Sequence, residues 1–147
     1  MILSAAEIQS RLSQDALVIR PYKEECQQPA SYDLRIDAAT ICPPMTCTLV
    51  HSREWVELPP DLAGTLRCRS SYARMGLQIG GGFVDPGFRG QLTLCLFNGG
   101  EEDIAFDAGD RAIQLIIHEV RGAKETYAGR YQDSQGTVTA RLSGRED

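Results

Sequence analysis

An arginine followed by two adjacent hydroxyl side chains stands near the middle of the sequence, at Arg69, Ser70 and Ser71, with Arg74 three residues further on. Guanidinium groups bind anions bidentately, and neighbouring hydroxyls can add hydrogen bonds to the same oxygens. The segment therefore suits the binding of a small anion such as a phosphate group. Taken alone, an arginine followed by serines also fits an ordinary polar turn.

A glycine-rich segment follows, in which three successive glycines end at Gly82 and precede Asp85 and Phe88. Glycines let the backbone approach a flat ligand closely, so that amide groups can read its edge. Asp85 stands before a Pro-Gly pair, which predicts a hairpin tip. A carboxylate there could take a proton from water, but the segment also fits a plain hairpin in which Asp85 only forms the turn.

Two further polar residues stand in otherwise strand-like segments. Asp33 lies at the start of an alternating strand, and Gln114 interrupts a long apolar one. A buried amide must find hydrogen-bond partners or it costs stability, so Gln114 is a candidate site residue. Asp33 is a second candidate, with an ordinary surface carboxylate as the alternative.

The elements that must position these residues are mostly short strands separated by glycine and proline. A short helix is expected within residues 1–16, where Ser4 and Glu7 have the spacing of a capping box. Many short strands with such punctuation predict an all-β fold, a distorted jelly roll or β-clip barrel. The expected strands cover residues 17–19, 32–36, 47–51, 54–58, 64–69, 77–84, 91–98, 104–106 and 112–120.

Length and composition limit the class of protein. The 147 residues suit one domain over residues 1–147, with a polar and flexible tail over residues 121–147 that could order over a ligand. No apolar run reaches the roughly 18 residues of a membrane span, and no secretion signal is recognised, so a cytoplasmic location is expected. The net charge of −5 argues against a nucleic-acid partner. Five irregularly spaced cysteines form no zinc motif and fit buried thiols better than disulfides.

Taken together and in order, these segments resemble the motifs of the trimeric dUTPases and the dCTP deaminases, and the likeness covers nearly the whole chain. The N-terminal MILSAAEI, the segment QPASYDLRI and residues 129–132 (GRYQ) are more similar to the deaminases. The segment GGGFVD, residues 88–90 (FRG) and residues 96–98 (LFN) are more similar to the dUTPases.

Position 95 bears on the choice between the two branches. The resemblance implies that deaminases of this kind use no zinc and activate water with a glutamate in a segment similar to ITLE. Here the strand reads TLCL, and alternation places Thr93 and Cys95 on one face, with the cysteine at the glutamate position. A thiol has an unperturbed pKa of about 8.5 and is a nucleophile rather than a proton shuttle. The sequence therefore favours the pyrophosphatase, a dUTP diphosphatase that forms dUMP and pyrophosphate.

The resemblance also implies roles for the candidate residues. Asp85 would orient and deprotonate the water that attacks the α-phosphorus, Phe88 would stack under the deoxyribose, and glycines up to Gly82 would present amides to the base. Mg²⁺ would bind with the triphosphate, and Asp33 would support it through water. The predicted contacts to the nucleotide, mainly through its phosphate oxygens, come from Arg69, Ser70, Ser71, Arg74 and Gln114.

The tail departs from both branches. dUTPases close the site with a phenylalanine in a glycine-rich arm, whereas this tail has no phenylalanine after Phe106, so that Tyr131 or Tyr127 would have to cover the base. Two alternatives stay open: a dCTP deaminase or bifunctional dCTP deaminase/dUTPase, and a nucleotide-binding regulator without catalysis. In each case the resemblance implies a homotrimer with composite sites.

Overall fold

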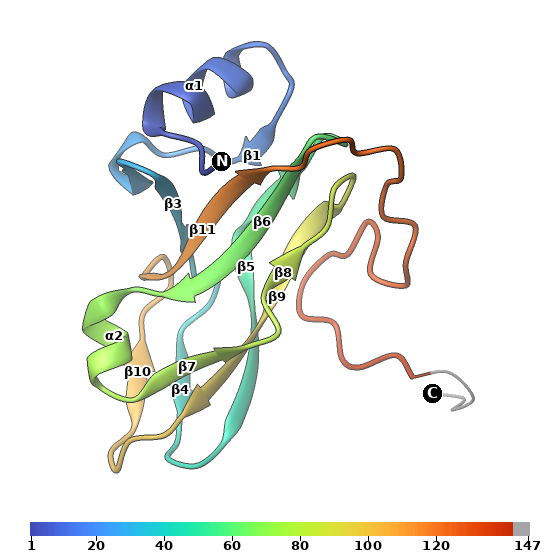
Figure 1. The fold of residues 1–147 in the computed structure, drawn as a ribbon. Helices are drawn as coiled ribbons and strands as arrows, with labels where there is room; N and C mark the ends of the chain where they lie inside the picture. Colours follow the sequence, from blue (N-terminus) through green and yellow to red (C-terminus); the bar gives the residue numbers. More distant parts are fainter. Residues whose placement is uncertain (143–147) are drawn as a thin grey trace.

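The computed structural model describes residues 1–142, and Figure 1 shows that strands dominate the fold. The helices are α1 (Ala5–Ser13), the short 3-10 helix η1 (Glu24–Cys26) and α2 (Ser70–Arg74). The strands are β1 (Val18–Arg20), β2 (Gln27–Gln28), β3 (Ser31–Arg35), β4 (Thr40–Cys42), β5 (Cys47–Glu57), β6 (Leu62–Cys68), β7 (Leu77–Gly80), β8 (Phe83–Val84), β9 (Arg89–Asn98), β10 (Ile104–Phe106) and β11 (Arg111–Glu119).

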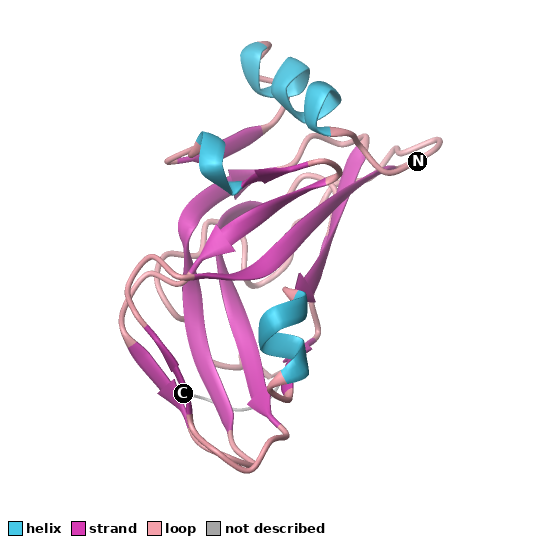
Figure 2. Ribbon diagram, turned by 90° about the vertical axis from the view of Figure 1, so that its left-hand side faces the viewer, coloured by secondary structure: helices cyan, strands magenta, loops and turns pink. Residues whose placement is uncertain are grey.

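Two antiparallel sheets enclose the core. One has the strand order β1-β5-β9-β7, the other has the order β2-β3-β11-β6-β8, and β10 pairs with β4 beside them. Alternate residues of β9, Leu92, Leu94 and Leu96, are buried, as are Ile113 and Leu115 of β11. Figure 2 shows long strands running through the molecule, with the helices lying outside the sheets. The predicted all-β fold is confirmed.

The N-terminal helix is shorter than the predicted residues 1–16. Ser4 caps it by accepting a hydrogen bond from the Glu7 amide, as the capping box predicts. Ile2 lies outside because it forms an isolated β-bridge with His118. The helix ends at Ser13, and Asp15 then takes a positive φ of 53°, which interrupts the helical backbone.

Two local expectations are corrected by the structure, and one short helix was not expected. The two strands expected over residues 47–51 and 54–58 form the single strand β5, with a register shift between His51 and Trp55. The strand expected over residues 77–84 is divided into β7 and β8, which belong to different sheets. Gly81 and Gly82 have φ values of 69° and 86°, a conformation that breaks a strand and favours glycine. The arginine–serine segment, for which the sequence predicted no helix, forms the start of the short helix α2.

The described part of the tail, residues 121–142, runs beside β8 and β9 (Figure 1). Ser134 forms a parallel bridge with Gly90, and the Gln91 amide donates to the Ser134 carbonyl at 2.8 Å. The predicted flexibility of this tail stays a prediction, and its residues 143–147 lie outside the described residues. Among the helices of residues 1–142, none is long and apolar enough to cross a membrane.

Candidate functional site

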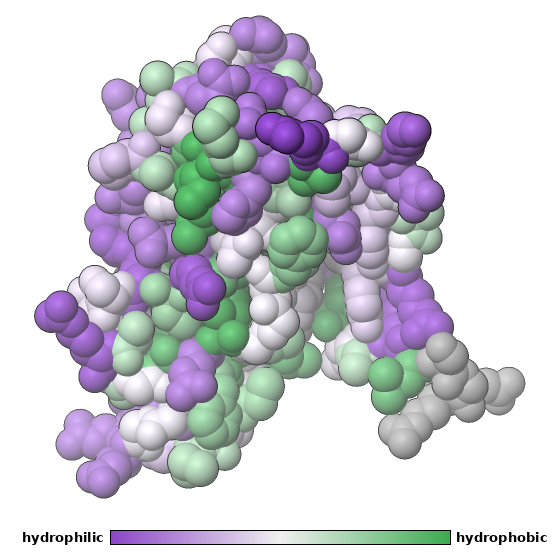
Figure 3. All heavy atoms as spheres, viewed as in Figure 1, coloured by the Kyte–Doolittle hydropathy of each residue, from purple (hydrophilic) through white to green (hydrophobic). Residues whose placement is uncertain are grey.

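A cavity of about 550 Å³ lies between β9 and the tail. Its floor is formed by Leu49 of β5 together with Gln91, Thr93 and Cys95 of β9. Leu49 is the direct cross-strand partner of Cys95, which places both side chains on the same face of the sheet. The space-filling view shows the hollow between the body of the molecule and the tail at the right (Figure 3).

One wall of this cavity is the turn between β8 and β9, which contributes Asp85 and Phe88. Asp85 is exposed, so its carboxylate is accessible to water and ligand. Phe88 is buried, and its ring meets that of Tyr127 edge-on with centroids 5.7 Å apart. The aspartate singled out in the sequence is thus brought to the same cavity as Cys95.

The tail forms the roof of the cavity, and residues 127–141 are here called the roof segment. Hydrogen bonds hold it to β9: the Asp133 amide donates to the Arg89 carbonyl at 2.9 Å, and the Gly136 amide donates to Gln91 Oε1 at 2.7 Å. The Arg89 guanidinium also forms an ion pair with the Asp133 carboxylate. The roof residues that line the cavity are Tyr127, Tyr131, Ser134, Val138, Thr139 and Ala140.

The Cys95 thiol is partly buried at the cavity floor. Burial raises its pKa above the ordinary value of a thiol, and the neighbouring Cys47 raises it further. The thiol is therefore protonated at neutral pH and cannot act as a base in that state. Of the two groups, the exposed Asp85 carboxylate is the proton acceptor available to a ligand in this cavity.

A second cluster of candidate residues lies on the other sheet. Gln114 of β11 is the direct partner of Asp33 on β3 and of Arg67 on β6, so the three side chains share one face of the sheet. Gln114 Nε2 donates a hydrogen bond to Ser31 Oγ at 3.3 Å. This gives the side-chain amide one of the hydrogen-bond partners that the sequence predicted it would need. This face differs from the core face, to which Ile113 and Leu115 contribute.

Asp33 and Arg69 are in contact in this second cluster. The Asp33 carboxylate is fully buried, and its Oδ2 lies 3.1 Å from Arg69 Nε and 3.9 Å from Arg111 Nη1. Burial raises the pKa of Asp33, and the two guanidinium groups partly offset that rise. Arg69 also donates to the Arg111 carbonyl at 3.2 Å, so its guanidinium is held from two sides.

The structure places six of the predicted site residues in two groups. Asp85, Phe88 and Tyr131 line the cavity, whereas Asp33, Arg69 and Gln114 belong to the second cluster.

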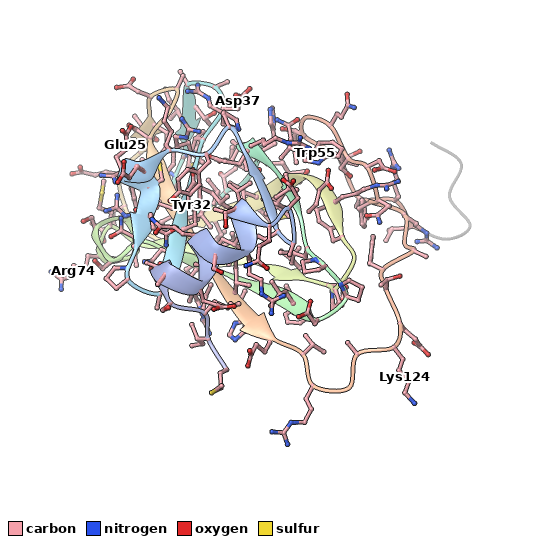
Figure 4. The ribbon with its side chains drawn as sticks, turned by 90° about the horizontal axis from the view of Figure 1, so that it is seen from above. Glu25, Tyr32, Asp37, Trp55, Arg74 and Lys124 are labelled. Atoms are coloured by element: carbon pink, nitrogen blue, oxygen red, sulfur yellow. The ribbon has the colours of Figure 1, made fainter. Side chains whose placement is uncertain are left out.

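The remaining predicted residues lie elsewhere. Ser70, Ser71 and Arg74 are exposed on α2, and Gly82 lies against Leu66 at the turn between β7 and β8. In Figure 4 the labelled Arg74 and the labelled Lys124 of the tail lie on opposite sides of the molecule. Within one chain, none of the arginine or serine side chains of the predicted phosphate-binding segment lines the cavity.

No group of three or more histidine, cysteine or acidic side chains in residues 1–142 is placed to hold a metal. Asp33, which was predicted to support Mg²⁺ through water, is buried against Arg69 instead. Its predicted role therefore has no support from its surroundings within one chain.

Sequence reasoning did not single out the polar groups that hold the roof segment. The side chains of Gln91 and Thr93 accept hydrogen bonds from backbone amides of the roof segment. His51 of β5 contacts the side chain of Thr137. The signal for the first two was their polar character on one face of an alternating strand. His51 gave no such signal, because its partner is 86 residues away in the sequence.

The chain thus combines an all-β fold of two main sheets with a roofed cavity, an accessible carboxylate and a separate arginine cluster. Residues 36–120 match the family described as dCTP deaminase-like. The chain is 38% identical to the dCTP deaminase of Thermococcus kodakarensis, over 81% of this chain and 87% of that protein. It is 30% identical to the "dCTP deaminase, dUMP-forming" of Methanopyrus kandleri, over 91% and 92% of the two chains.

The chain belongs to the dCTP deaminase-like family, within the superfamily of dUTPases and dCTP deaminases. The predicted superfamily is thus confirmed. The native dUTPase of EIAV has a similar fold, with a TM-score of 0.64 and 23% identity, over 79% of this chain and 98% of that one. The named members of the family are enzymes, and the relatives' names support the deaminase alternative better than the predicted dUTP diphosphatase.

Proposed function

We propose that the chain is an enzyme that converts dCTP, with water as the second substrate, to dUTP and ammonia. The observation that carries this proposal is the 38% identity to a dCTP deaminase over 81% of the chain. The cavity of about 550 Å³ has the size of a small-molecule site, and aromatic and aliphatic side chains provide most of its walls. A pyrimidine base and its deoxyribose are ligands of matching size and character.

The proposed chemistry assigns the proton transfers to Asp85. Its carboxylate would accept a proton from water as the water oxygen bonds to C4 of the cytosine ring. That proton would pass to N3 of the ring. The proton of the new C4 hydroxyl would then pass to the amino group, and the C4–N bond would break as the C4=O bond forms, so that ammonia leaves. Cys95 is not proposed as the base, because its raised pKa keeps the thiol protonated.

Phosphate binding requires the second cluster. Arg69 is pre-oriented by Asp33 and Arg111, but it does not line the cavity of its own chain. In a symmetric trimer, the arginine cluster of one subunit would face the cavity of a neighbour and complete a composite site. We therefore propose the homotrimer as the active form. Mg²⁺ would arrive with the triphosphate as part of the substrate, as it commonly does with nucleotides.

A second candidate is the hydrolysis of dUTP to dUMP and pyrophosphate, and the pair Asp85 and Cys95 favours it. The cavity has a carboxylate that could activate water for attack at the α-phosphorus, whereas a thiol stands where the resemblance expects the glutamate of a deaminase. A relative named "dCTP deaminase, dUMP-forming" suggests that one chain can perform both steps.

One experiment separates these functions. The purified full chain is incubated with dCTP or with dUTP in the presence of Mg²⁺, and ammonia and pyrophosphate are measured separately. Ammonia from dCTP supports the proposed deamination, and pyrophosphate from dUTP alone supports the second candidate. Both products from dCTP indicate the bifunctional enzyme. Binding of either nucleotide without any product would contradict both enzymatic proposals and favour a non-catalytic regulator.

A further inference from the structure

Side chains, rather than backbone pairing, fasten residues 136–138 of the roof segment to the sheet. The Val138 amide donates to Thr93 Oγ1 at 3.0 Å, next to the bond that Gly136 makes with Gln91. Between these two positions, Thr137 Oγ1 lies 2.9 Å from His51 Nδ1. These attachments immediately precede Thr139 and Ala140, which line the cavity.

His51 and Thr93 are direct cross-strand partners on β5 and β9, so their side chains stand side by side on one face. Two adjacent residues of the roof segment, Thr137 and Val138, are thus held by two adjacent side chains of the sheet. The bond to His51 extends the attachment from β9 to the neighbouring strand β5.

Asp37 holds the imidazole of His51 on the side of the ring away from Thr137. Its Nε2 lies 3.2 Å from Asp37 Oδ2, and Arg53 donates from Nε to Asp37 Oδ1 at 3.3 Å. Arg53 also donates to the Asp37 carbonyl at 3.0 Å. When Nε2 donates its proton to the carboxylate, Nδ1 keeps its lone pair and accepts the hydroxyl proton of Thr137. Asp37 therefore sets both the orientation of the ring and the tautomer that the contact needs.

We propose that Asp37, His51 and Thr137 form a clamp that holds the roof segment closed over the cavity, and that His51 is a positioning residue for the ligand bound there. Only the identity of that ligand rests on the proposed function. Because His51 does not line the cavity, it acts through the roof segment and not on reacting atoms. Loss of the clamp releases residues 137–140, so that substrate binding weakens while the chemical step is largely retained.

The same order of carboxylate, imidazole and hydroxyl occurs in nucleophilic triads. Here Thr137 is exposed and is absent from the cavity lining, which argues for an anchor. The two roles predict different kinetics. Removal of a nucleophilic hydroxyl would abolish kcat, whereas removal of an anchor raises KM.

The test measures release of the roof segment without any nucleotide. Trypsin can cut after Arg130 and Arg141, both within the roof segment, and mass spectrometry identifies the bond that is cleaved. Thr137→Val keeps the shape of the side chain but removes the hydroxyl, and His51→Phe keeps a ring without the nitrogen acceptor. In both variants we expect cleavage to be roughly threefold to tenfold faster, the range for the loss of one net hydrogen bond. The matched control is Gln135→Ala, because Gln135 is exposed, lies outside the cavity lining and makes no side-chain hydrogen bond among the described residues.

The double variant His51→Phe/Thr137→Val should be cleaved no faster than either single variant, because both changes remove the same contact. Wild-type cleavage rates in both single variants would overturn the clamp, as would fully additive effects in the double variant. Since no substrate is present, absence of ammonia and pyrophosphate would contradict the proposed function and leave this result standing. Where the enzyme is active, a higher KM with nearly unchanged kcat supports the clamp, and loss of kcat in Thr137→Val contradicts it.

Discussion

The buried carboxylate of Asp33 lies 3.1 Å from the guanidinium of Arg69, on the face of the sheet that carries Gln114. Two arginines close to a carboxylate would normally lower its pKa, yet burial outweighs them and the pKa of Asp33 is raised. Two effects on Asp33 therefore oppose each other: the ion pair with Arg69 favours the charged carboxylate, and burial disfavours it.

The raised pKa of Asp33 predicts a pH-dependent loss of stability. The folded state holds this proton more tightly than the unfolded state, so the contribution of Asp33 falls as pH rises from the unperturbed value of about 3.9 through the raised folded value. Asp33→Asn cannot titrate and should lack this decrease. The check is the difference in free energy of unfolding between wild type and variant, measured by urea titration from pH 4 upward. A difference that does not change with pH would contradict the raised pKa.

Removal of Arg69 should separate folding from anion binding. Arg69→Ala loses charge-assisted hydrogen bonds of about 1.5–3 kcal/mol to a bound triphosphate, and it also leaves the buried Asp33 with one partner fewer. Adding Asp33→Asn to Arg69→Ala should recover stability but not affinity. Calorimetric titration with a non-hydrolysable triphosphate measures the affinity, and urea unfolding measures the stability. Unchanged affinity in Arg69→Ala would assign this arginine a purely structural role.

A buried ion pair joins the two sheets and predicts a large stability effect. Arg35 Nε of β3 lies 2.6 Å from Glu54 Oε1 of β5, and both side chains are almost completely buried. Glu54→Gln should destabilise the fold by about 3–5 kcal/mol, because it leaves the Arg35 charge uncompensated. The control is Glu7→Gln, which breaks the exposed pair with Arg11 on α1 and should cost well under 1 kcal/mol. Equal losses of unfolding free energy in the two variants would contradict the prediction that the buried ion pair contributes more to stability than the exposed one.

The fold was largely predictable because its signals are local. Alternation along residues 91–98 predicted most of β9, and the capping spacing of Ser4 and Glu7 located α1. The five-residue helix α2 was missed because its N-cap, Arg69, makes no side-chain capping bond and the segment is too short to show a helical period. The division of residues 77–84 between two sheets depends on the positive φ values of Gly81 and Gly82, which the sequence permits but does not require.

The sequence singled out three residues that line the cavity, but it did not reveal how the candidate residues are arranged. Asp85, Phe88 and Tyr131 do meet at one cavity, although they come from a turn and from the tail. That Arg69 would lie apart from them could not be inferred, because order along the chain does not reveal which sheet face a residue occupies. The clamp of His51 on Thr137 was hidden for the same reason, since only the folded tail brings these two residues together.

The pair Asp85 and Cys95 supports the most direct test of the proposed chemistry. Asp85→Asn keeps size and shape but removes the carboxylate that would accept a proton from water. Nucleotide should still bind, while product formation should fall by roughly 10²–10⁴-fold, as is typical for a lost general base. The measurement is kcat for ammonia release from dCTP and for pyrophosphate release from dUTP, with nucleotide affinity measured in parallel.

Cys95→Ala is the matched control in the same cavity. It should retain whichever activity the wild type has, because the protonated thiol is assigned no proton transfer in these steps. If Asp85→Asn keeps full activity, then Asp85 is only a turn residue. If Cys95→Ala abolishes ammonia release, then the thiol takes part in deamination and the assignment of the base to Asp85 is wrong.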